Sequence, residues 1–357
     1  MTAADGVVAV TGASGFTGGH MVRELVHHGY KVRACLRDSA SWRGQDAVRY
    51  LSRLPGVEIV SGCDLFVPGS FDAAFQGCVG VFHVAAVLGN SAKPGSQPNA
   101  SGDTGQDTYD GGLVGTQNVL GAINKSGTVQ RLIYTSSTSA VTHGFSADGH
   151  EWTETDWASD GADPKSWRTA WYARSKVDTE HLVNEAAAAS AGAWDAVTMN
   201  PAMIVGPLLF AAQNGQWIQS VGELASGTFE GDDRWWNMID VRDLVSGHRL
   251  ALESAVDHVN SRGGSRYIMH GTGGRSEMRF GTEVAAVISQ RFPSFSIGSP
   301  KDAGGQQQQR RPKTKNDSKK AVAMLGVRVR PVEETIVECV ESAIELGLIQ
   351  PRQKGRL

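Results

Sequence analysis

Short runs of β-branched and apolar residues alternate along the first half of the chain with segments whose apolar residues recur at helical spacing. The runs predict five strands, at 7–10, 31–36, 57–61, 79–84 and 131–135. The helical spacing predicts helices at 19–28 and 113–125. Strands that alternate with helices form a parallel sheet with helices on both faces, so the pattern predicts a doubly wound α/β fold of the Rossmann type.

The second half of the chain continues this alternation less regularly. It predicts a long helix at 171–189, strands at 197–199, 204–205 and 237–241, a helix at 243–252 and a closing amphipathic helix at 332–348. The polar stretch at 304–315, which holds four consecutive glutamines, is typical of a solvated loop. We expect a Rossmann domain over 1–205, to which 237–255 return, and a smaller C-terminal substrate lobe built mainly from 206–236 and 256–357.

Composition and charge exclude several classes of function. The chain has 357 residues, of which 40% are hydrophobic and 20% charged, as in an ordinary globular protein. A formal net charge of −3 gives no electrostatic footprint for nucleic acid or an anionic membrane, so we expect neither partner. The longest apolar stretch, 79–88, is shorter than the about 20 residues that a membrane helix needs.

Targeting and cysteine usage agree with that picture. The N-terminus has neither the basic region nor the apolar core of a signal peptide, so we expect a cytoplasmic protein. As a separate expectation, the protein is a monomer or a homodimer. Cys35, Cys63, Cys78 and Cys339 lie far apart, and no histidine stands at metal-ligand spacing from them. This spacing predicts reduced thiols and no metal site.

A glycine-rich loop follows the first predicted strand directly. In the segment 11–19, Gly12 permits a tight turn, Gly15 lets the backbone approach a pyrophosphate, and Gly18 lets the following helix pack closely on the strand. The helix then presents free N–H groups and its positive dipole end to the phosphates. The alternative is an ordinary strand-to-helix turn, but the position after the first strand favours a dinucleotide site.

The end of the second predicted strand bears on the choice of cofactor. NAD-binding folds usually place an acid there, whereas an arginine accommodates the 2′-phosphate of NADP. Leu36 takes the acid position here and Arg37 follows it, with Arg33 nearby. A guanidinium fork suits phosphate, so we expect NADP(H) as the cofactor. Two observations leave the alternative open: Arg37 could lie on an exposed loop, and Asp38 is its neighbour.

Three residues carry the candidate chemistry. Tyr172 and Lys176 are four residues apart within the long predicted helix, so both project from one face. A nearby ammonium and a positively charged nicotinamide would lower the pKa of a tyrosine from about 10, which lets it exchange a proton with a carbonyl oxygen. Ser137 lies at the carboxyl end of the fifth strand, where ligands of parallel sheets bind, and can orient that oxygen.

On these residues the chain resembles the extended (atypical) short-chain dehydrogenases/reductases, in particular the dihydroflavonol-4-reductase-like group with the yeast-type methylglyoxal, aldehyde and ketone reductases. The resemblance spans almost the full length. Its motifs are 11–18, 32–37, 62–65, 70–72, 81–86, 115–119, 135–137, 172–176, 200–201, 206–207, 240–243 and 330–334.

The resemblance implies NADPH use, a Ser137–Tyr172–Lys176 triad and Arg37 at the 2′-phosphate. It places Asp64 and Leu65 beside adenine, although Asp64 could equally be an ordinary helix cap. The further cofactor-binding residues that it implies are Thr11, Gly12, Ser14, Gly15, Phe16, Thr17, Gly18, Val84, Ala85, Ala86, Thr135, Ser136, Pro201, Ala202, Met203 and Ile204. Two departures concern the substrate side: the active-site Asn of other branches aligns with Gly112, and the loop 89–112 is extended.

These observations predict an NADPH-dependent reductase of aldehydes or ketones, or the reverse alcohol dehydrogenase. A sugar-nucleotide epimerase or dehydratase, or a hydroxysteroid dehydrogenase, is the alternative on the same scaffold; a non-catalytic NADP sensor is a third. Five tryptophans in the segments expected around the pocket favour an aromatic substrate, unless they fill the interface between the lobes. They are Trp167, Trp171, Trp217, Trp235 and Trp236.

Overall fold

A seven-stranded parallel sheet forms the centre of the protein. The structure is a computed structural model that describes residues 1–2, 6–87, 105–142, 150–230, 235–255, 265–271, 277–298 and 318–350. The strand order is β3-β2-β1-β4-β5-β6-β9. The strands are β1 (Val7–Thr11), β2 (Lys31–Leu36), β3 (Val57–Ser61), β4 (Cys78–His83), β5 (Arg131–Thr135), β6 (Asp195–Pro201) and β9 (Ser265–Met269). All neighbouring pairs are parallel, so the carboxyl ends of the strands meet at one edge.

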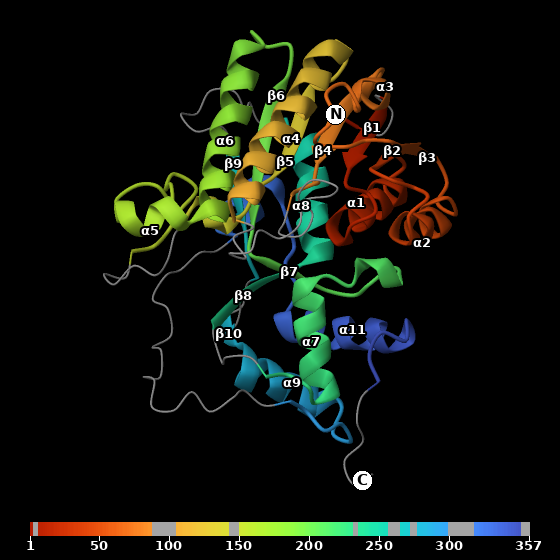
Figure 1. Cartoon of the computed structure of the whole chain (residues 1–357), viewed down its shortest axis with the longest axis vertical. Coiled ribbons are helices and arrows are strands. Elements are labelled where there is room, and N and C mark those ends of the chain that lie inside the picture. The colour runs from red at the N-terminus through yellow and green to blue at the C-terminus, as the bar shows by residue number, and fades with distance from the viewer. Residues whose placement is uncertain are drawn as a thin grey trace.

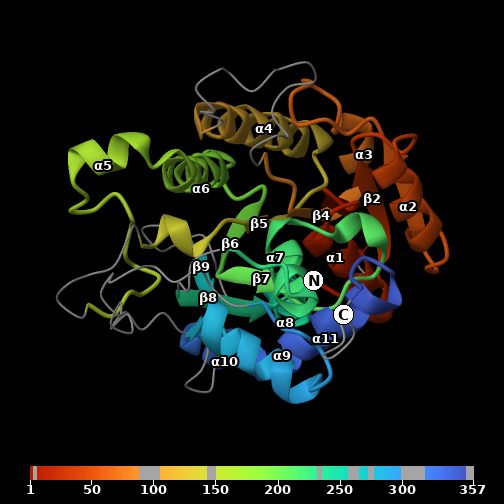
Figure 2. The ribbon, with the colours of Figure 1, turned by 60° about the horizontal axis from the view of Figure 1, so that its bottom comes forward.

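Helices cover both faces of this sheet (Figures 1 and 2), as its apolar side chains on both faces require. One face carries α1 (Phe16–His27), α2 (Trp42–Leu51) and α8 (Val241–Glu253). The other carries α3 (Asp72–Phe75), α4 (Gly105–Ser126) and α6 (Trp171–Ala189), with α4 packed along α6. The order reverses between β1 and β4, and such a switch point is where a doubly wound sheet binds its ligand. The predicted fold class is therefore confirmed.

A smaller lobe lies beyond the carboxyl edge of the sheet, below it in Figure 1. Its three-stranded sheet contains β7 (Met203–Val205), β8 (Trp235–Asp240) and β10 (Glu277–Arg279), packed by α7 (Gln216–Ser226), α9 (Ala285–Arg291) and α11 (Val332–Glu345). Because β7 follows β6 after a single residue, the lobe joins the large sheet directly at the edge where the site is expected. The remaining elements are α5 (Pro164–Thr169), α10 (Lys319–Leu325), and the short helices η3 (Thr138–Ala140), η4 (Ala211–Gln213) and η5 (Phe280–Val284).

Comparison with the predicted elements shows where the pattern was ambiguous. Strands 31–36, 57–61 and 131–135 and helix 171–189 have the predicted bounds. In contrast, α4 begins at Gly105 rather than 113, because its first two turns hold polar residues and glycines that masked the helical spacing. The stretch 304–315 lies outside the described residues.

One strand and one helix within the range expected mainly for the substrate lobe belong to the large sheet. The range 256–357 was expected mainly in the substrate lobe, but β9 pairs with β6 as the edge strand of the large sheet, and α10 packs against it. Its sequence Ser-Arg-Tyr-Ile-Met carries a charged residue inside the strand, which hid it from a hydrophobicity pattern. The rest of the domain division stays a prediction. No described helix is long and apolar enough to cross a membrane.

Candidate active site

The glycine loop between β1 and α1 forms a narrow cradle at the carboxyl edge. Gly12 has φ +68°, and a Cβ there would lie 2.9 Å from the Cα of Ala85. Both the backbone conformation and the lack of space therefore disfavour a side chain at this position. Gly15 is the N-cap of α1, and its N–H donates to Gly12 O at 2.9 Å. At Gly18 a Cβ would come within 2.1 Å of Gly12 O, which shows how closely the helix approaches the loop.

This cradle fits the pyrophosphate of a dinucleotide. No described side chain caps the N-terminus of α1, so the first-turn amides, including those of Phe16 and Thr17, keep the donors that helices leave unpaired. A Cβ at Gly15 would meet only Gly12 O, at 3.2 Å, and the space above the loop is otherwise open. Ser14 is half-buried beside it. Small residues in the walls, free N–H groups and the positive end of a helix dipole are what an anionic diphosphate needs.

Thr11 links the first and fourth strands beneath the cradle. Its buried Oγ1 accepts the backbone N–H groups of Val84 and Ala85, both at 3.1 Å, and bonds to His83 Nδ1 at 2.9 Å. Burial lowers the pKa of His83 to about 3, so this histidine is a neutral core residue. Thr11 therefore acts by holding the 84–86 segment in place. This segment forms the wall of the cradle that faces the glycine loop.

Arg37 extends from the carboxyl end of β2 into solvent. The side chain is exposed and makes no hydrogen bond or ion pair with another described residue, so its guanidinium is available to a ligand. The neighbouring Asp38 is engaged otherwise: its Oδ1 accepts the N–H groups of Ala40 and Ser41 at 2.8 and 3.2 Å. Arg33 donates to Glu58 at 2.9 Å and does not join Arg37.

The loop after β3 is held in place at the carboxyl edge of the sheet. Ser70 Oγ donates to Asp64 O at 2.7 Å and accepts the Asp64 N–H at 3.1 Å. Asp64 Oδ1 accepts the Phe66 N–H at 2.9 Å, which is a local turn contact and leaves Oδ2 for a ligand. Asn118 Nδ2 fixes the Leu65 carbonyl at 2.7 Å. Both residues therefore lie in a rigid loop at the ligand edge.

The structure brings Ser137, Tyr172 and Lys176 together at this edge. Ser137 follows β5, and its Oγ accepts the Ser139 N–H at 3.1 Å and lies close enough to Tyr172 to lower the pKa of the phenol. Tyr172 begins α6 with 38% of its surface exposed, whereas Lys176 is buried. Lys176 Nζ lies 5.9 Å from the Tyr172 ring centroid and donates to Thr135 O at 3.2 Å. An ammonium has three donors, so two remain for ligand hydroxyls.

The electrostatics of the pair differ from the expectation. Burial raises the pKa of Tyr172 above its usual value, and the Ser137 hydrogen bond only opposes that rise. The predicted lowering by Lys176 is therefore wrong for the protein alone, because withdrawal of water from the phenol outweighs an ammonium that is not in hydrogen-bond contact. Burial also lowers the pKa of Lys176 to about 8, against a raising effect of Glu180.

The neighbours of the triad occupy the remaining predicted positions. Thr135 Oγ1 is bonded to His248 at 2.8 Å, and Ser136 Oγ is buried without a hydrogen-bond partner among the described residues. The segment of Pro201, Ala202, Met203 and Ile204 crosses from β6 to β7 at the same edge. The structure thus gathers every predicted site residue around one edge of the large sheet.

A pocket behind Tyr172 and Lys176 explains the departure at Gly112. Residues of β4, β5, α4 and α6 line it, among them His83 and Tyr134. A Cβ at Gly112 would come within 2.2 Å of Ser175 Oγ, because α4 and α6 approach closely at this point. An asparagine cannot enter here without displacing Ser175.

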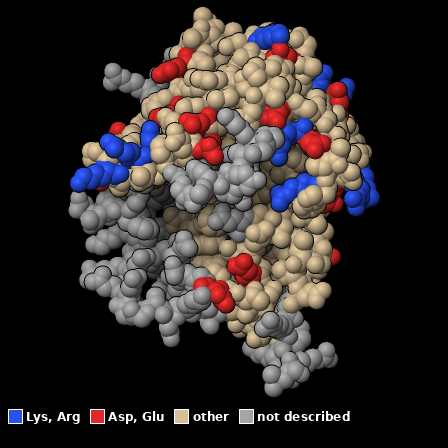
Figure 3. Space-filling view, in the orientation of Figure 1, with Lys and Arg blue, Asp and Glu red and all other residues tan. Residues whose placement is uncertain are grey.

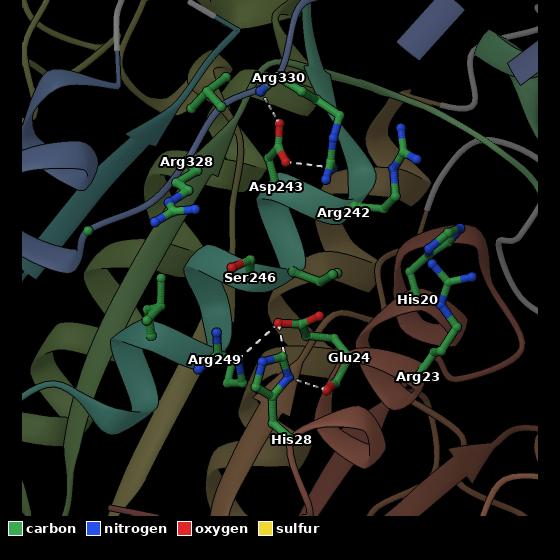
Figure 4. A pocket seen from close by; sticks show the side chains of 14 residues that line it. His20, Arg23, Glu24, His28, Arg242, Asp243, Ser246, Arg249, Arg328 and Arg330 are labelled. Atoms are coloured by element: carbon green, nitrogen blue, oxygen red, sulfur yellow. Dashed lines mark hydrogen bonds and ion pairs between the residues drawn. The ribbon is translucent and has the colours of Figure 1, made fainter. Parts of the chain in front are cut away.

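A larger groove between α1 and α8 lies on the opposite face of the sheet from α6 (Figure 4). Three of its arginines are paired with carboxylates: Arg242 with Asp240, Arg249 with Glu24 at 2.9 Å, and Arg330 with Asp243 at 2.6 Å. Arg23 and Arg328 form no ion pair with another described residue. Across the face shown in Figure 3, acidic and basic side chains are interspersed rather than segregated. The edge of the sheet that carries the triad is therefore the candidate site that we describe further.

The tryptophans are only partly available to a substrate. Trp236 is buried and stacks on Phe280 with ring centroids 3.7 Å apart, so it fills the small lobe. Trp217 packs edge-on against Trp236 but stays 36% exposed. Trp171 stacks against Arg174 at 4.9 Å. Trp167 is half-buried near α6, and Trp235 lies in β8. The aromatic character of the substrate stays a prediction.

Comparisons with known proteins agree with this geometry. The profile of the NAD dependent epimerase/dehydratase family matches residues 8–262. Cinnamoyl-CoA reductase CAD2 of Medicago truncatula is 30% identical, over 95% of this chain and 96% of its own length. The bifunctional dihydroflavonol 4-reductase/flavanone 4-reductase of Malus domestica is 28% identical, over 81% and 77%. The structure of yeast methylglyoxal/isovaleraldehyde reductase Gre2 complexed with NADPH superposes with a TM-score of 0.75 at 21% identity, covering 96% of this chain and 99% of that chain.

Proposed function

Because the chain belongs to the NAD dependent epimerase/dehydratase family, among the extended short-chain dehydrogenases/reductases, we propose that it is an NADPH-dependent reductase of an aldehyde or ketone. The broader assignment, an NAD(P)-dependent oxidoreductase, follows from the family and from relatives that are reductases over most of the chain. The observation that carries the finer proposal is the convergence of Ser137, Tyr172 and Lys176 beside the glycine cradle.

The preference for NADP(H) is supported by the residues after β2. Arg37 is exposed and unengaged among the described residues, whereas the carboxylate of Asp38 is held by its own turn. The turn holds Asp38 Oδ1 away from a ribose 2′-hydroxyl, while a 2′-phosphate would find the guanidinium of Arg37. The yeast reductase Gre2, which shares the fold, was solved in complex with NADPH, and this agrees with the choice.

In the proposed reaction the bound nucleotide supplies a hydride to the carbonyl carbon. Tyr172 donates its proton to the carbonyl oxygen, so that the product is a neutral alcohol. Ser137 holds that oxygen through its hydroxyl, which lies close to the phenol. Lys176 places a positive charge near the phenol and offers its remaining N–H donors to ribose hydroxyls. The raised pKa of Tyr172 keeps the phenol protonated before the reaction, as a proton donor requires.

The test is NADPH oxidation with a panel of aldehydes and ketones, including aromatic ones. The wild-type protein should oxidise NADPH with at least one of them, and Tyr172→Phe should lose about 10²–10⁴ in kcat while binding NADPH normally. An epimerase or dehydratase would instead convert a sugar nucleotide without net NADPH loss. A non-catalytic sensor would bind NADPH and oxidise none. Full activity in Tyr172→Phe would remove this residue as the proton donor.

A further inference from the structure

A buried ion pair lies one helical turn beyond Lys176. Glu180 of α6 and Arg266 of β9 are 0% and 1% exposed, and Arg266 Nε donates to Glu180 Oε2 at 2.7 Å. Burying two charges costs free energy unless every polar atom finds a partner, so such a pair needs an explanation beyond its own attraction. The other hydrogen-bond partners of Glu180 and Arg266 lie near Ser137, at the carboxyl edge of the large sheet.

Arg266 uses its remaining donors on the main chain around Ser137. NH2 donates to Ala140 O at 3.3 Å, and NH1 donates to the carbonyl oxygens of Glu154 and Asp156 at 3.1 and 2.6 Å. The guanidinium also stacks on Trp157, 3.9 Å from the ring centroid. One side chain from the edge strand therefore holds the short helix η3, which begins directly after Ser137, against the 154–156 segment.

Glu180 reaches Ser137 by a second route. Its Oε1 accepts from Asn200 Nδ2 at 2.6 Å, and the same Nδ2 donates to Ser137 O at 3.1 Å. Asn200 is fully buried at the end of β6. The Glu180 carboxylate thus orients both the Asn200 amide, which contacts Ser137, and the Arg266 guanidinium. An uncharged side chain of the same shape would make neither hydrogen bond as strongly.

Glu180 is also the charged group that acts most directly on Lys176. Its negative charge opposes the loss of the ammonium that burial favours. The other titratable groups facing Lys176 are His83 of β4, neutral because of burial, and Tyr134 and Tyr172, whose pKa values burial raises. Helix α4 contributes the uncharged residues Thr108, Gly112 and Thr116 to the pocket beside Tyr172 and Lys176.

We propose that Glu180 is a positioning residue for the reaction: it fixes the Ser137 segment through Asn200 and Arg266, and it places a negative charge one helical turn from Lys176. The proposal rests on the reductase function proposed above, because it assigns a role to a residue that touches neither substrate nor cofactor. A purely structural role would predict weaker folding and nothing about the charge of Lys176.

The first test follows Lys176 without turnover. The full chain is labelled with 13C-lysine, and the Lys176 Cε signal, assigned with Lys176→Met, is titrated by NMR in the absence of nucleotide. The midpoint should lie near 8 in the wild type and about one pH unit lower in Glu180→Gln, since an opposite charge at close range is removed. Asp195→Asn is the matched control, because Asp195 pairs with Arg131 at the opposite edge of the same sheet.

The second test uses kcat for NADPH-dependent reduction. With a shift of about one unit, the ratio of wild-type to Glu180→Gln activity should rise from about one at pH 6 to about five at pH 8. Asp195→Asn should give a ratio that does not change with pH. If Glu180→Gln does not fold, Glu180→Gln/Arg266→Met removes both buried charges, and the midpoint of Lys176 should still fall because the carboxylate one helical turn away is absent.

Two results overturn the proposal: an unchanged Lys176 midpoint in the folded variants, or an activity loss that is equal at every pH. A wild-type protein that reduces no carbonyl compound contradicts the proposed function instead. The NMR comparison then still decides whether Glu180 holds the charge of Lys176, so the two failures are distinguishable.

Discussion

Replacing Gly15 and Gly18 by alanine separates the binding role of the glycine loop from its folding role. At Gly18 the new Cβ would lie 2.1 Å from Gly12 O and 2.7 Å from the Gly12 carbonyl carbon, both backbone atoms that cannot rotate away. The helix would have to move by roughly 1 Å, and such overpacking costs about 3 kcal/mol. Alanine returns about 1 kcal/mol through its higher helix propensity. A net loss of about 2 kcal/mol should lower Tm by about 3 °C.

Gly15→Ala should behave in the opposite way. Gly15 has φ −83° and ψ 175°, extended backbone that any residue adopts, and its Cβ would meet only Gly12 O at 3.2 Å. As an N-cap, alanine costs less than about 1 kcal/mol relative to glycine. The methyl group would, however, occupy the space through which the pyrophosphate approaches, and a loss of about 1.4 kcal/mol already weakens NADPH binding about tenfold.

The assay combines thermal unfolding, monitored by circular dichroism, with titration of NADPH fluorescence. The reasoning predicts that Gly18→Ala loses stability and that Gly15→Ala loses NADPH affinity with Tm nearly unchanged. If Gly15→Ala binds NADPH as tightly as the wild type, the phosphates do not lie over this loop. If Gly18→Ala unfolds at the wild-type temperature, the close approach of α1 to the loop is not as the structure has it.

Two further predictions concern residues outside the loop. Arg37→Asp should weaken NADPH at least about tenfold and leave NADH nearly unchanged, because only the 2′-phosphate meets the guanidinium; equal losses in KM for both cofactors would show that Arg37 does not contact this phosphate. Thr11→Val should cost about 2 kcal/mol in urea unfolding, since the partly buried N–H groups of Val84 and Ala85 each lose their acceptor. An unchanged unfolding midpoint would mean that both amides find other partners.

The sequence predicted the parts of the site that depend on local spacing. Tyr172 and Lys176 share a helical face because they are four residues apart, and α6 has the bounds that its pattern indicates. The glycine loop follows β1 because the turn needs a residue such as Gly12, with φ +68°. Leu36 and Arg37 come at the predicted end of β2. In each case the determining interactions lie within a few residues along the chain.

Other features could not be found in this way. Arg266 lies 86 residues from Glu180, and nothing in its short strand marks it as a partner of the helix that carries Tyr172 and Lys176. The spacing of Tyr172 and Lys176 predicts a lowered pKa for the phenol, but burial, which depends on the whole cleft, raises it. The engagement of Asp38 by its own turn likewise became visible only in the folded loop.

The sequence by itself determined the alternation of strands and helices, the glycine turn and the pairing of a phenol with an amine one turn apart, because backbone propensity and helical periodicity act over short distances. Only the tertiary structure decided that β9 closes the large sheet, that Glu180 and Arg266 support Ser137, and which charges are buried. Contacts between distant segments and the exclusion of water from a side chain arise only when the chain is packed, and they set the electrostatics of the site.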